Sequence, residues 1–313
     1  MDKAIGRGYG KLILFGEQFV VHGVPGIATG IDKYFQIEME KIEENDIIIE
    51  DNVFYNETAQ FSKDPEHIKC TTIRPFIDHF KINNVKSTFS GNLEKKGMGM
   101  SAAYAVATIR AANELFSLGL DDKEVNKWAY ECEKVPHGNP SGIDNTCATY
   151  GKTIWFEKNM SGGENKIELF SLKKPLLLVI GNTCKSASTG ELVAGVTKLK
   201  ESDPDKYDPI FEDAKQIVVE AKQALESGDL EMIGELMNNN QALLREIGVS
   251  CDELEDLIEI ALEKGALGAK LSGAGGGGIM FALAKNTDVQ EEIAKAFEKE
   301  GYKAVKIVVG GVE

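Results

Sequence analysis

The stretch GMGMSAA, residues 97–103, opens directly into the alanine-rich segment 102–117, AAYAVATIRAANELFS. Alanine is the strongest helix former, so the segment predicts a helix. Glycines let a backbone turn tightly and approach a ligand closely, and the first turn of a helix presents free N–H groups and a positive dipole end. The stretch therefore predicts a phosphate-binding loop. If this stretch is considered by itself, a purely structural glycine-rich turn with a serine N-cap explains it equally well.

Two carboxylates flank a polar turn in EKVPHGNPSGIDN, residues 133–145. Glu133 ends a predicted helix, 121–134, for which Asp121-x-x-Glu124 provides an N-terminal cap. Asp144 follows the turn. Phosphoryl transfer needs a metal ligand and a group that orients or deprotonates the attacking hydroxyl, and these two carboxylates are candidates for the two roles. The alternative is a solvated glutamate and an aspartate hydrogen-bonded within its own turn.

A third segment, KLSGAGGGG at residues 270–278, contains four consecutive glycines. Such a run is costly in chain entropy, and a loop that approaches a ligand closely would explain it. The alternative is a flexible connection between the predicted strands 269–272 and 279–284. Lys11 begins another predicted strand, 11–16. It is a candidate for binding the transferring oxygen, or simply an edge lysine.

The remaining patterns predict an α+β protein. Asp252 begins a helix behind a capping box, Ser250-x-x-Glu253, and a second box, Thr287-x-x-Gln290, begins another helix at Asp288. Further helices are predicted at 209–227 and 229–246, and further strands at 34–42, 46–51, 153–157, 166–170, 175–181 and 303–309. The length of 313 residues allows two domains, which we predict at 1–172 and 173–313.

The composition of the chain limits the kinds of partner and the cellular compartment that we expect. The net charge of −15 argues against nucleic acid or an anionic membrane as the main partner. The five cysteines are dispersed, which favours a reducing compartment over a disulfide framework. The longest apolar run, 176–180, is far too short for a membrane span. We therefore expect a cytoplasmic protein that binds small molecules.

The three segments, in this order and at these separations, resemble the GHMP kinases, and the resemblance runs from Lys11 to about Ala284. It implies a two-domain GHMP kinase fold. The N-terminal domain would be like the second domain of ribosomal protein S5 and the C-terminal domain a ferredoxin-like α+β domain, with the active site between them. Within the family the likeness is greatest to the mevalonate kinases, on KLILFGE (11–17), HGNPSGIDN (137–145) and IGVS (247–250).

The resemblance implies transfer of the γ-phosphoryl of ATP, with Mg²⁺, to a small hydroxyl-bearing substrate. Mevalonate, phosphorylated to 5-phosphomevalonate in isoprenoid precursor biosynthesis, is the substrate it favours, and a homodimer is compatible with it. The catalytic residues would be Asp144, which takes or orients the hydroxyl proton, and Lys11, which neutralises charge. The implied metal ligands are Ser101 and Glu133. The phosphates would be held by Gly97, Met98, Gly99, Met100, Ser101, Ala102 and Ala103, and the substrate would be contacted by Glu17, Gln18, His22, Tyr104, Thr189 and Gly275.

Three positions depart from the family pattern. Met100 stands where a serine is usual, Gln18 where mevalonate kinases have a histidine, and Ala187 where an arginine is common. Two of them lie on the substrate side, so another GHMP kinase reaction remains open, on a phosphorylated mevalonate, a sugar or a related hydroxy acid. A non-catalytic nucleotide-binding regulator would have lost a catalytic group. Lys11 and Asp144 are both kept, which makes it the weakest alternative.

Overall fold

The computed structural model describes residues 2–93, 97–138, 140–185 and 187–310, and the chain groups into two compact units. Unit 1 comprises Met1–Lys11 and Asp32–Gly151, and unit 2 comprises Leu12–Ile31 and Lys152–Glu313. Strands β1 (Lys3–Phe15) and β2 (Gly26–Lys41) run from one unit into the other. The units are discontinuous in sequence, whereas the predicted domains are continuous, and the division at residue 172 stays a prediction.

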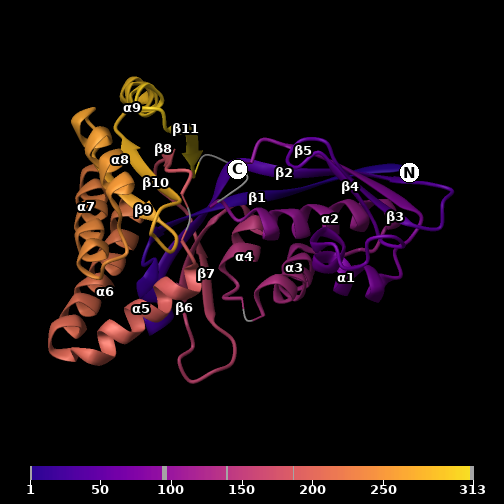
Figure 1. Ribbon diagram of the computed structural model, residues 1–313, viewed down its shortest axis with the longest axis horizontal. Coiled ribbons are helices and arrows are strands. Elements are labelled where there is room, and N and C mark those ends of the chain that lie inside the picture. Colours follow the sequence, from indigo (N-terminus) through magenta and orange to yellow (C-terminus); the bar gives the residue numbers. More distant parts are fainter. Residues whose placement is uncertain (1, 94–96, 139, 186, 311–313) are drawn as a thin grey trace. The chain divides into compact units, whose positions relative to one another are not determined.

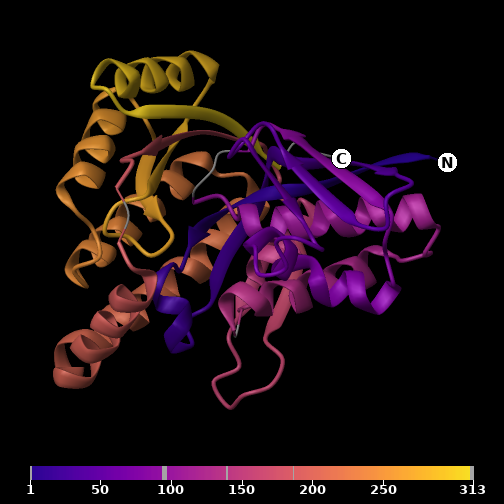
Figure 2. The ribbon, with the colours of Figure 1, turned by 45° about the vertical axis from the view of Figure 1, so that its right-hand side comes forward.

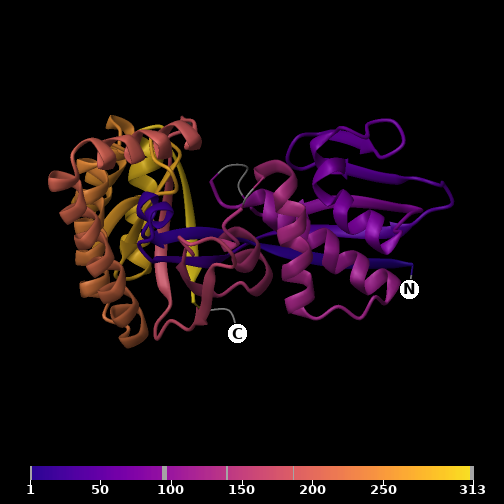
Figure 3. The ribbon, with the colours of Figure 1, turned by 90° about the horizontal axis from the view of Figure 1, so that it is seen from below.

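In unit 1, four helices lie against one sheet. The strand order is β4-β3-β5-β2, β1 pairs with β2, and β3 and β5 are parallel. The burial of β5 alternates along the strand, as expected for a sheet with one covered face. Figures 1 and 3 show the helices gathered on that side. The bounds are β3 (Ile47–Asp51), β4 (Glu57–Gln60), β5 (Val85–Gly91), α1 (Ile68–Phe80), α2 (Met100–Phe116), α3 (Asp122–His137) and α4 (Ile143–Tyr150).

Small residues bring α2 directly onto β1. A Cβ added to Gly6 would lie 2.0 Å from the carbonyl oxygen of Ala107, and one added to Gly8 would lie 2.1 Å from that of Ala103. Real Cβ atoms do not approach so closely, so only glycine fits on the strand. The alanines of α2 that face β1 are buried because the helix packs so closely against this strand. This packing fixes the start of α2 beside Lys11, at the end of the unit 1 part of β1.

Unit 2 contains an antiparallel sheet in the order β11-β8-β10-β9. Helices α8 and α9 cover it, and Gly181 of β8 leaves room for Leu257 and Phe297 from these helices. Figure 2 shows α9 running beside β11. The bounds are β8 (Leu176–Asn182), β9 (Gly268–Ser272), β10 (Ile279–Ala284), β11 (Lys303–Val309), α5 (Thr189–Ser202), α6 (Pro204–Ser227), α7 (Leu230–Glu246), α8 (Asp252–Glu263) and α9 (Thr287–Lys299). In the same unit, β6 (Thr153–Glu157) pairs with β2 and with β7 (Lys166–Phe170), and a short 3₁₀ helix spans Gln18–His22.

Helix α7 covers the outer edge of β9. Asn238 accepts a hydrogen bond from the N–H of Ala269 at 3.0 Å and donates one to the carbonyl of Leu267 at 3.3 Å. Gln241 accepts one from the N–H of Leu271 at 3.0 Å. Backbone groups that would otherwise offer an open sheet edge are therefore satisfied by side chains. No helix among the described residues is long and apolar enough to cross a membrane.

The predicted α+β class is confirmed, and strands β6, β7, β10 and β11 have the predicted bounds. The capping box of α3 is also confirmed, because Asp121 and Glu124 bond each other's backbone N–H groups. The other two boxes were wrong. Cys251 is the N-cap of α8 and Asn286 that of α9. The Ser250 hydroxyl instead donates to Glu255 at 2.5 Å, and the buried Gln290 donates to the carbonyls of Leu178 and Ile307.

Three helices were not predicted: α1, α4 and α5. The prediction that residues 137–144 form only a turn was wrong at its end, because Asp144 lies in the first turn of α4. This helix has eight residues and starts behind Gly142, so no amphipathic period is visible in the sequence. Asn139, in the same stretch, lies outside the described residues.

The glycine run at residues 273–278 is hydrogen-bonded to neighbouring backbone. Gly273 and all of Gly275–Gly278 have positive φ values, between 65° and 121°. The Gly276 N–H donates to Val249 at 2.8 Å, and the Gly278 N–H donates to Lys185 at 2.8 Å. The run therefore needs glycines for its own conformation and for close contact with neighbouring backbone.

Gly275→Ala is expected to destabilise the protein far more than Gly278→Ala. Both changes place a side chain at positive φ, which costs about 1–2 kcal/mol. A Cβ on Gly275 would in addition lie 2.1 Å from the carbonyl oxygen of Val249, whereas nothing lies within 4 Å of one on Gly278. Overpacking adds about 1–3 kcal/mol at position 275 only. Urea unfolding curves of both variants measure the difference; equal midpoints would contradict the described contact.

Candidate active site

In unit 1, four sequence-predicted residues lie close together. The hydroxyl of Ser101 donates a 2.6 Å hydrogen bond to Oε1 of Glu133, which joins α2 to α3. Nζ of Lys11 lies 3.2 Å from Oδ1 of Asp144, which joins β1 to α4. The packing of β1, α2, α3 and α4 thus brings together two pairs that are 32 and 133 residues apart in sequence.

The predicted phosphate loop precedes the N-terminus of α2. Gly99 is the N-cap residue with φ of +73°, and no side chain caps the helix. Free N–H groups at a helix start, together with the positive dipole end, form a site for an anion. The backbone N–H of Lys11 donates to the carbonyl of Met98 at 2.9 Å, so the strand also holds the loop in place. This geometry suits phosphate groups lying next to the Lys11 side chain.

Burial differs between the two carboxylates. The side chain of Glu133 is 3% exposed and that of Asp144 is 37% exposed. Burial raises the pKa of Glu133, and the Asp144 charge raises it further. The hydrogen bond from Ser101 and the charges of His137 and Lys11 act in the opposite direction. Asp144 is therefore the accessible carboxylate, and Glu133 is a buried one whose charge a cation would stabilise.

Gly99→Ala is expected to lower activity by more than tenfold while costing only about 1–2 kcal/mol of stability. An added Cβ would lie 2.8 Å from Cγ of Lys11, so the lysine side chain has to move. Gly119→Ala is the matched control, because its φ of +75° is nearly the same and nothing lies within 4 Å of an added Cβ. Thermal unfolding and turnover of both variants measure the two effects. Equal activity losses would show that the Gly99 contact is unimportant.

Unit 2 contains a second group of predicted residues. Glu17 forms an ion pair with Lys270, and both side chains are 0% exposed. Gln18 donates a 2.6 Å hydrogen bond from Nε2 to the carbonyl of Ala274, at the head of the glycine run. These contacts bring the turn after β1 against the loop between β9 and β10. Lys270 was not identified as a functional residue from the sequence, although a lysine within the predicted strand 269–272 was a usable signal.

The other predicted substrate residues are more scattered. In unit 2, His22 packs edge-on against Phe211 with ring centroids 5.1 Å apart, and burial, then the Lys200 charge, lowers its pKa. Thr189 is the first residue of α5. In unit 1, Tyr104 is buried and its hydroxyl already donates to the carbonyl of Lys69 at 2.8 Å. The packing gives Tyr104 a structural role, and its assignment as a substrate contact stays a prediction.

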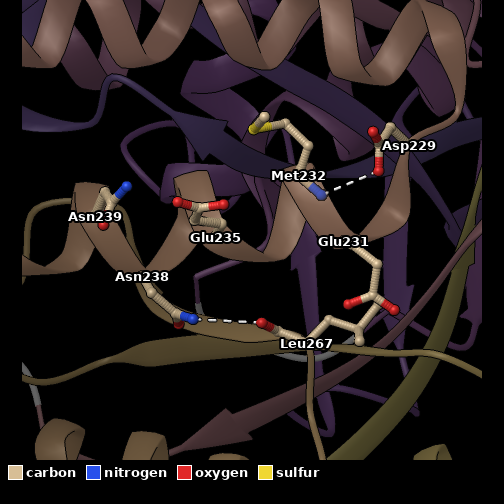
Figure 4. Close-up of a pocket in the computed structure, with 7 residues that line it drawn as sticks. All are labelled: Asp229, Glu231, Met232, Glu235, Asn238, Asn239 and Leu267. Atoms are coloured by element: carbon tan, nitrogen blue, oxygen red, sulfur yellow. Dashed lines mark hydrogen bonds between the residues drawn. The ribbon is translucent and has the colours of Figure 1, made fainter.

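A pocket of about 590 Å³ lies elsewhere in unit 2, near the start of α7 (Figure 4). Asp229 caps this helix by accepting from the N–H of Met232 at 3.1 Å, and Asn238 bonds Leu267. None of the predicted site residues lines the pocket, and these polar groups serve helix and edge-strand packing. The lining residues are Asp229, Glu231, Met232, Glu235, Asn238, Asn239 and Leu267.

Family models, a curated relative and a solved structure are similar to most of this chain. The family model described as GHMP kinases N terminal domain matches residues 66–152, and the model described as GHMP kinases C terminal matches residues 221–303. Mevalonate kinase of Pyrococcus furiosus is 37% identical, over 96% of this chain and 94% of its own. The crystal structure of L. major mevalonate kinase in complex with R-mevalonate has a TM-score of 0.89 and 35% identity, covering 99% of this chain and 98% of that one.

Proposed function

Because this chain belongs to the GHMP kinases, we propose that it transfers the γ-phosphoryl group of ATP to the 5-hydroxyl of (R)-mevalonate. The observation that carries the proposal is the pairing of Lys11 with Asp144 within unit 1, whose helix α2 presents an uncapped N-terminus after the glycine-rich loop. A cation and a carboxylate beside a phosphate site are what phosphoryl transfer to an alcohol needs. The product, 5-phosphomevalonate, is an isoprenoid precursor.

In the proposed reaction, the substrate hydroxyl oxygen attacks the γ-phosphorus, the bond to the departing ADP breaks, and the hydroxyl proton passes to Asp144. The ammonium group of Lys11 offsets negative charge on the transferring group. The free N–H groups at the start of α2 hold the phosphates. Catalysis then depends on positioning and charge neutralisation, without a covalent enzyme intermediate.

The donor set of unit 1 fits Mg²⁺. Ser101 and Glu133 offer a hydroxyl and a carboxylate oxygen 2.6 Å apart beside the phosphate loop. Mg²⁺ prefers oxygen ligands and is usually held by one or two carboxylates together with substrate phosphates. The described residues contain no cluster of three or more histidine, cysteine, aspartate or glutamate side chains suited to a metal. When bound, the ion would neutralise phosphate charge.

Similarity to a mevalonate complex favours mevalonate as the substrate. The L. major mevalonate kinase structure is a complex with R-mevalonate, and the similarity covers nearly all of both chains. Glu17, which we propose as a substrate contact, forms a buried ion pair with Lys270. We propose Gln18, His22, Thr189 and Gly275 as further substrate contacts, and all four belong to unit 2.

The hydrogen bonding of Gln18 supports a second class of substrate as the alternative. The amide nitrogen of Gln18 is engaged by Ala274, and its Oε1 is buried without a partner among the described residues. With one N–H given to Ala274, the glutamine keeps its second amide N–H and the buried Oε1, a hydrogen-bonding pattern that differs from that of the histidine usual at this position. Another alcohol, such as a phosphorylated mevalonate or a sugar, is therefore the alternative acceptor for the same phosphoryl-transfer groups.

The direct test is a coupled ADP-release assay with Mg-ATP and (R)-mevalonate, run in parallel with 5-phosphomevalonate and galactose. Saturable turnover with mevalonate alone is the expected result. Turnover only with another alcohol would overturn the substrate and keep the kinase. No turnover with any of them, together with intact ATP binding, would favour the nucleotide-binding regulator.

A further inference from the structure

The most deeply buried charges in unit 2 belong to Lys270 and Glu17. Lys270 lies in the middle of β9, a strand whose residues are all buried. Its ammonium pairs with Glu17, donates to the carbonyl of Leu271 at 2.8 Å, and lies 5.3 Å from the ring centre of Phe281. Burial lowers the pKa of Lys270, and Glu17 acts against that shift.

Stability does not explain this pair. Taking two charges out of water costs free energy that their attraction often fails to recover, and apolar residues of the same size are frequently as stable. A buried pair does, however, fix geometry, because either charge left alone is strongly unfavourable. The pair connects Glu17, in the turn after β1, with Lys270, in the strand that leads into the glycine run.

Two further links join the same segments. Gln18 donates to the carbonyl of Ala274 at 2.6 Å, and because that partner is a carbonyl, the amide nitrogen must face it. The hydroxyl of Ser272 donates to the carbonyl of Ile13 at 2.9 Å and accepts from the N–H of Ile13 at 3.1 Å. All these residues belong to unit 2. The end of β1, its turn and the start of the glycine run are therefore held together at three successive points.

We propose that Lys270 and Gln18 are positioning residues that lock the Glu17–Gln18 turn to the glycine run 273–278, so that both present one rigid surface to the alcohol substrate. Neither residue takes part in proton or phosphoryl transfer. The structural part of the proposal stands on the contacts alone, and its kinetic consequence rests on the proposed function.

Hydrogen exchange tests the lock without any assay. The Val20 amide is bonded to Gly16 at 2.9 Å and the Gly276 amide to Val249 at 2.8 Å, so they report on the turn and on the glycine run. Glu17→Gln/Lys270→Met removes both buried charges and avoids the misfolding that one unpaired charge threatens. We expect both amides to exchange at least tenfold faster, with the interior of β8 unchanged. Unchanged protection of Gly276, or an equal loss across β8, would overturn the lock.

Gln18→Met provides a second, milder variant, because it removes the bond to Ala274 and buries no charge. We expect faster exchange of the Gly276 amide here too. Lys306→Met is the matched control: Lys306 pairs with Glu291 at 2.5 Å in the same unit, but its side chain is 50% exposed. Its loss should leave both reporter amides unchanged.

Kinetics test the role in positioning. For both the double variant and Gln18→Met, kcat/KM for mevalonate should fall at least tenfold, while the Kd for a non-hydrolysable Mg-ATP analogue stays within twofold. Faster exchange with unchanged kcat/KM would overturn the positioning role and show that the lock is purely structural. If the wild-type chain turns over no mevalonate, the proposed substrate is wrong, while the exchange measurement still decides whether the lock exists.

Discussion

Asp144→Ala lowers kcat by about 10²- to 10⁴-fold, the range expected when a group that accepts the proton of the reacting hydroxyl is removed. The carboxylate lies 3.2 Å from the Lys11 ammonium and is 37% exposed, so it is both accessible and paired with the cation that we place at the transferring group. Because Asp144 lies in α4 and is absent from the loop that we propose for the phosphates, ATP binding should be nearly intact. Steady-state ADP release and calorimetric binding of an ATP analogue separate the two effects.

Two controls sharpen this test. Asp144→Asn keeps the shape of the side chain and removes its basicity, so its kcat should fall nearly as far. Asp122→Asn removes another carboxylate of unit 1, one that pairs with Arg110 at 2.6 Å on the surface, and should leave kcat unchanged. Wild-type turnover in Asp144→Ala would exclude this residue from the mechanism.

Glu133→Gln raises the Mg²⁺ concentration needed for half-maximal activity at least tenfold and lowers kcat. The amide keeps an oxygen that can accept from Ser101, so the local hydrogen bond survives while the negative charge is lost. Mg²⁺ titrations of the ADP-release rate measure the shift. Glu131→Gln, on the same helix and paired with exposed Lys134, is the control and should behave as wild type.

The same variant separates function from stability. Burial raises the pKa of Glu133, so folding favours its protonated form and opposes its ionised form. For a carboxyl with a raised pKa, this cost is present above the folded-state pKa and vanishes at low pH. Glu133→Gln removes the cost, so its Tm at pH 7 should equal or exceed that of the wild type. A large drop in Tm would instead identify Glu133 as a structural residue.

The sequence by itself determined those features that depend on near neighbours. Strands β6, β7, β10 and β11 were predicted with the bounds observed, since their apolar runs end at clear turn signals. The capping box at Asp121 was found because it needs only two residues three positions apart. The loop 97–103 and the helix after it follow from glycine and alanine propensities. GHMP kinase membership was likewise readable from the order of three local motifs.

Tertiary structure decided what depends on packing between distant segments. Helix α1 contains Pro75 and adjacent threonines, so its own propensities oppose the helix that packing against α3 stabilises. The capping boxes predicted at Ser250 and Thr287 fit the local sequence rule but do not form. The Ser250 hydroxyl donates to Glu255 instead, and Asn286 is the N-cap residue of α9.

The site itself shows the same division. The sequence named Lys11, Ser101, Glu133 and Asp144, but only the packing of β1, α2, α3 and α4 brings them into hydrogen-bonding and ion-pairing distance. The four glycines could be read from the sequence as a loop. The sequence did not show why glycines are needed there. They adopt positive φ values and contact the backbone of Val249 and Lys185, which lie in other segments of unit 2. Propensity acts over a few residues, whereas a site is formed by side chains whose distance only the folded core sets.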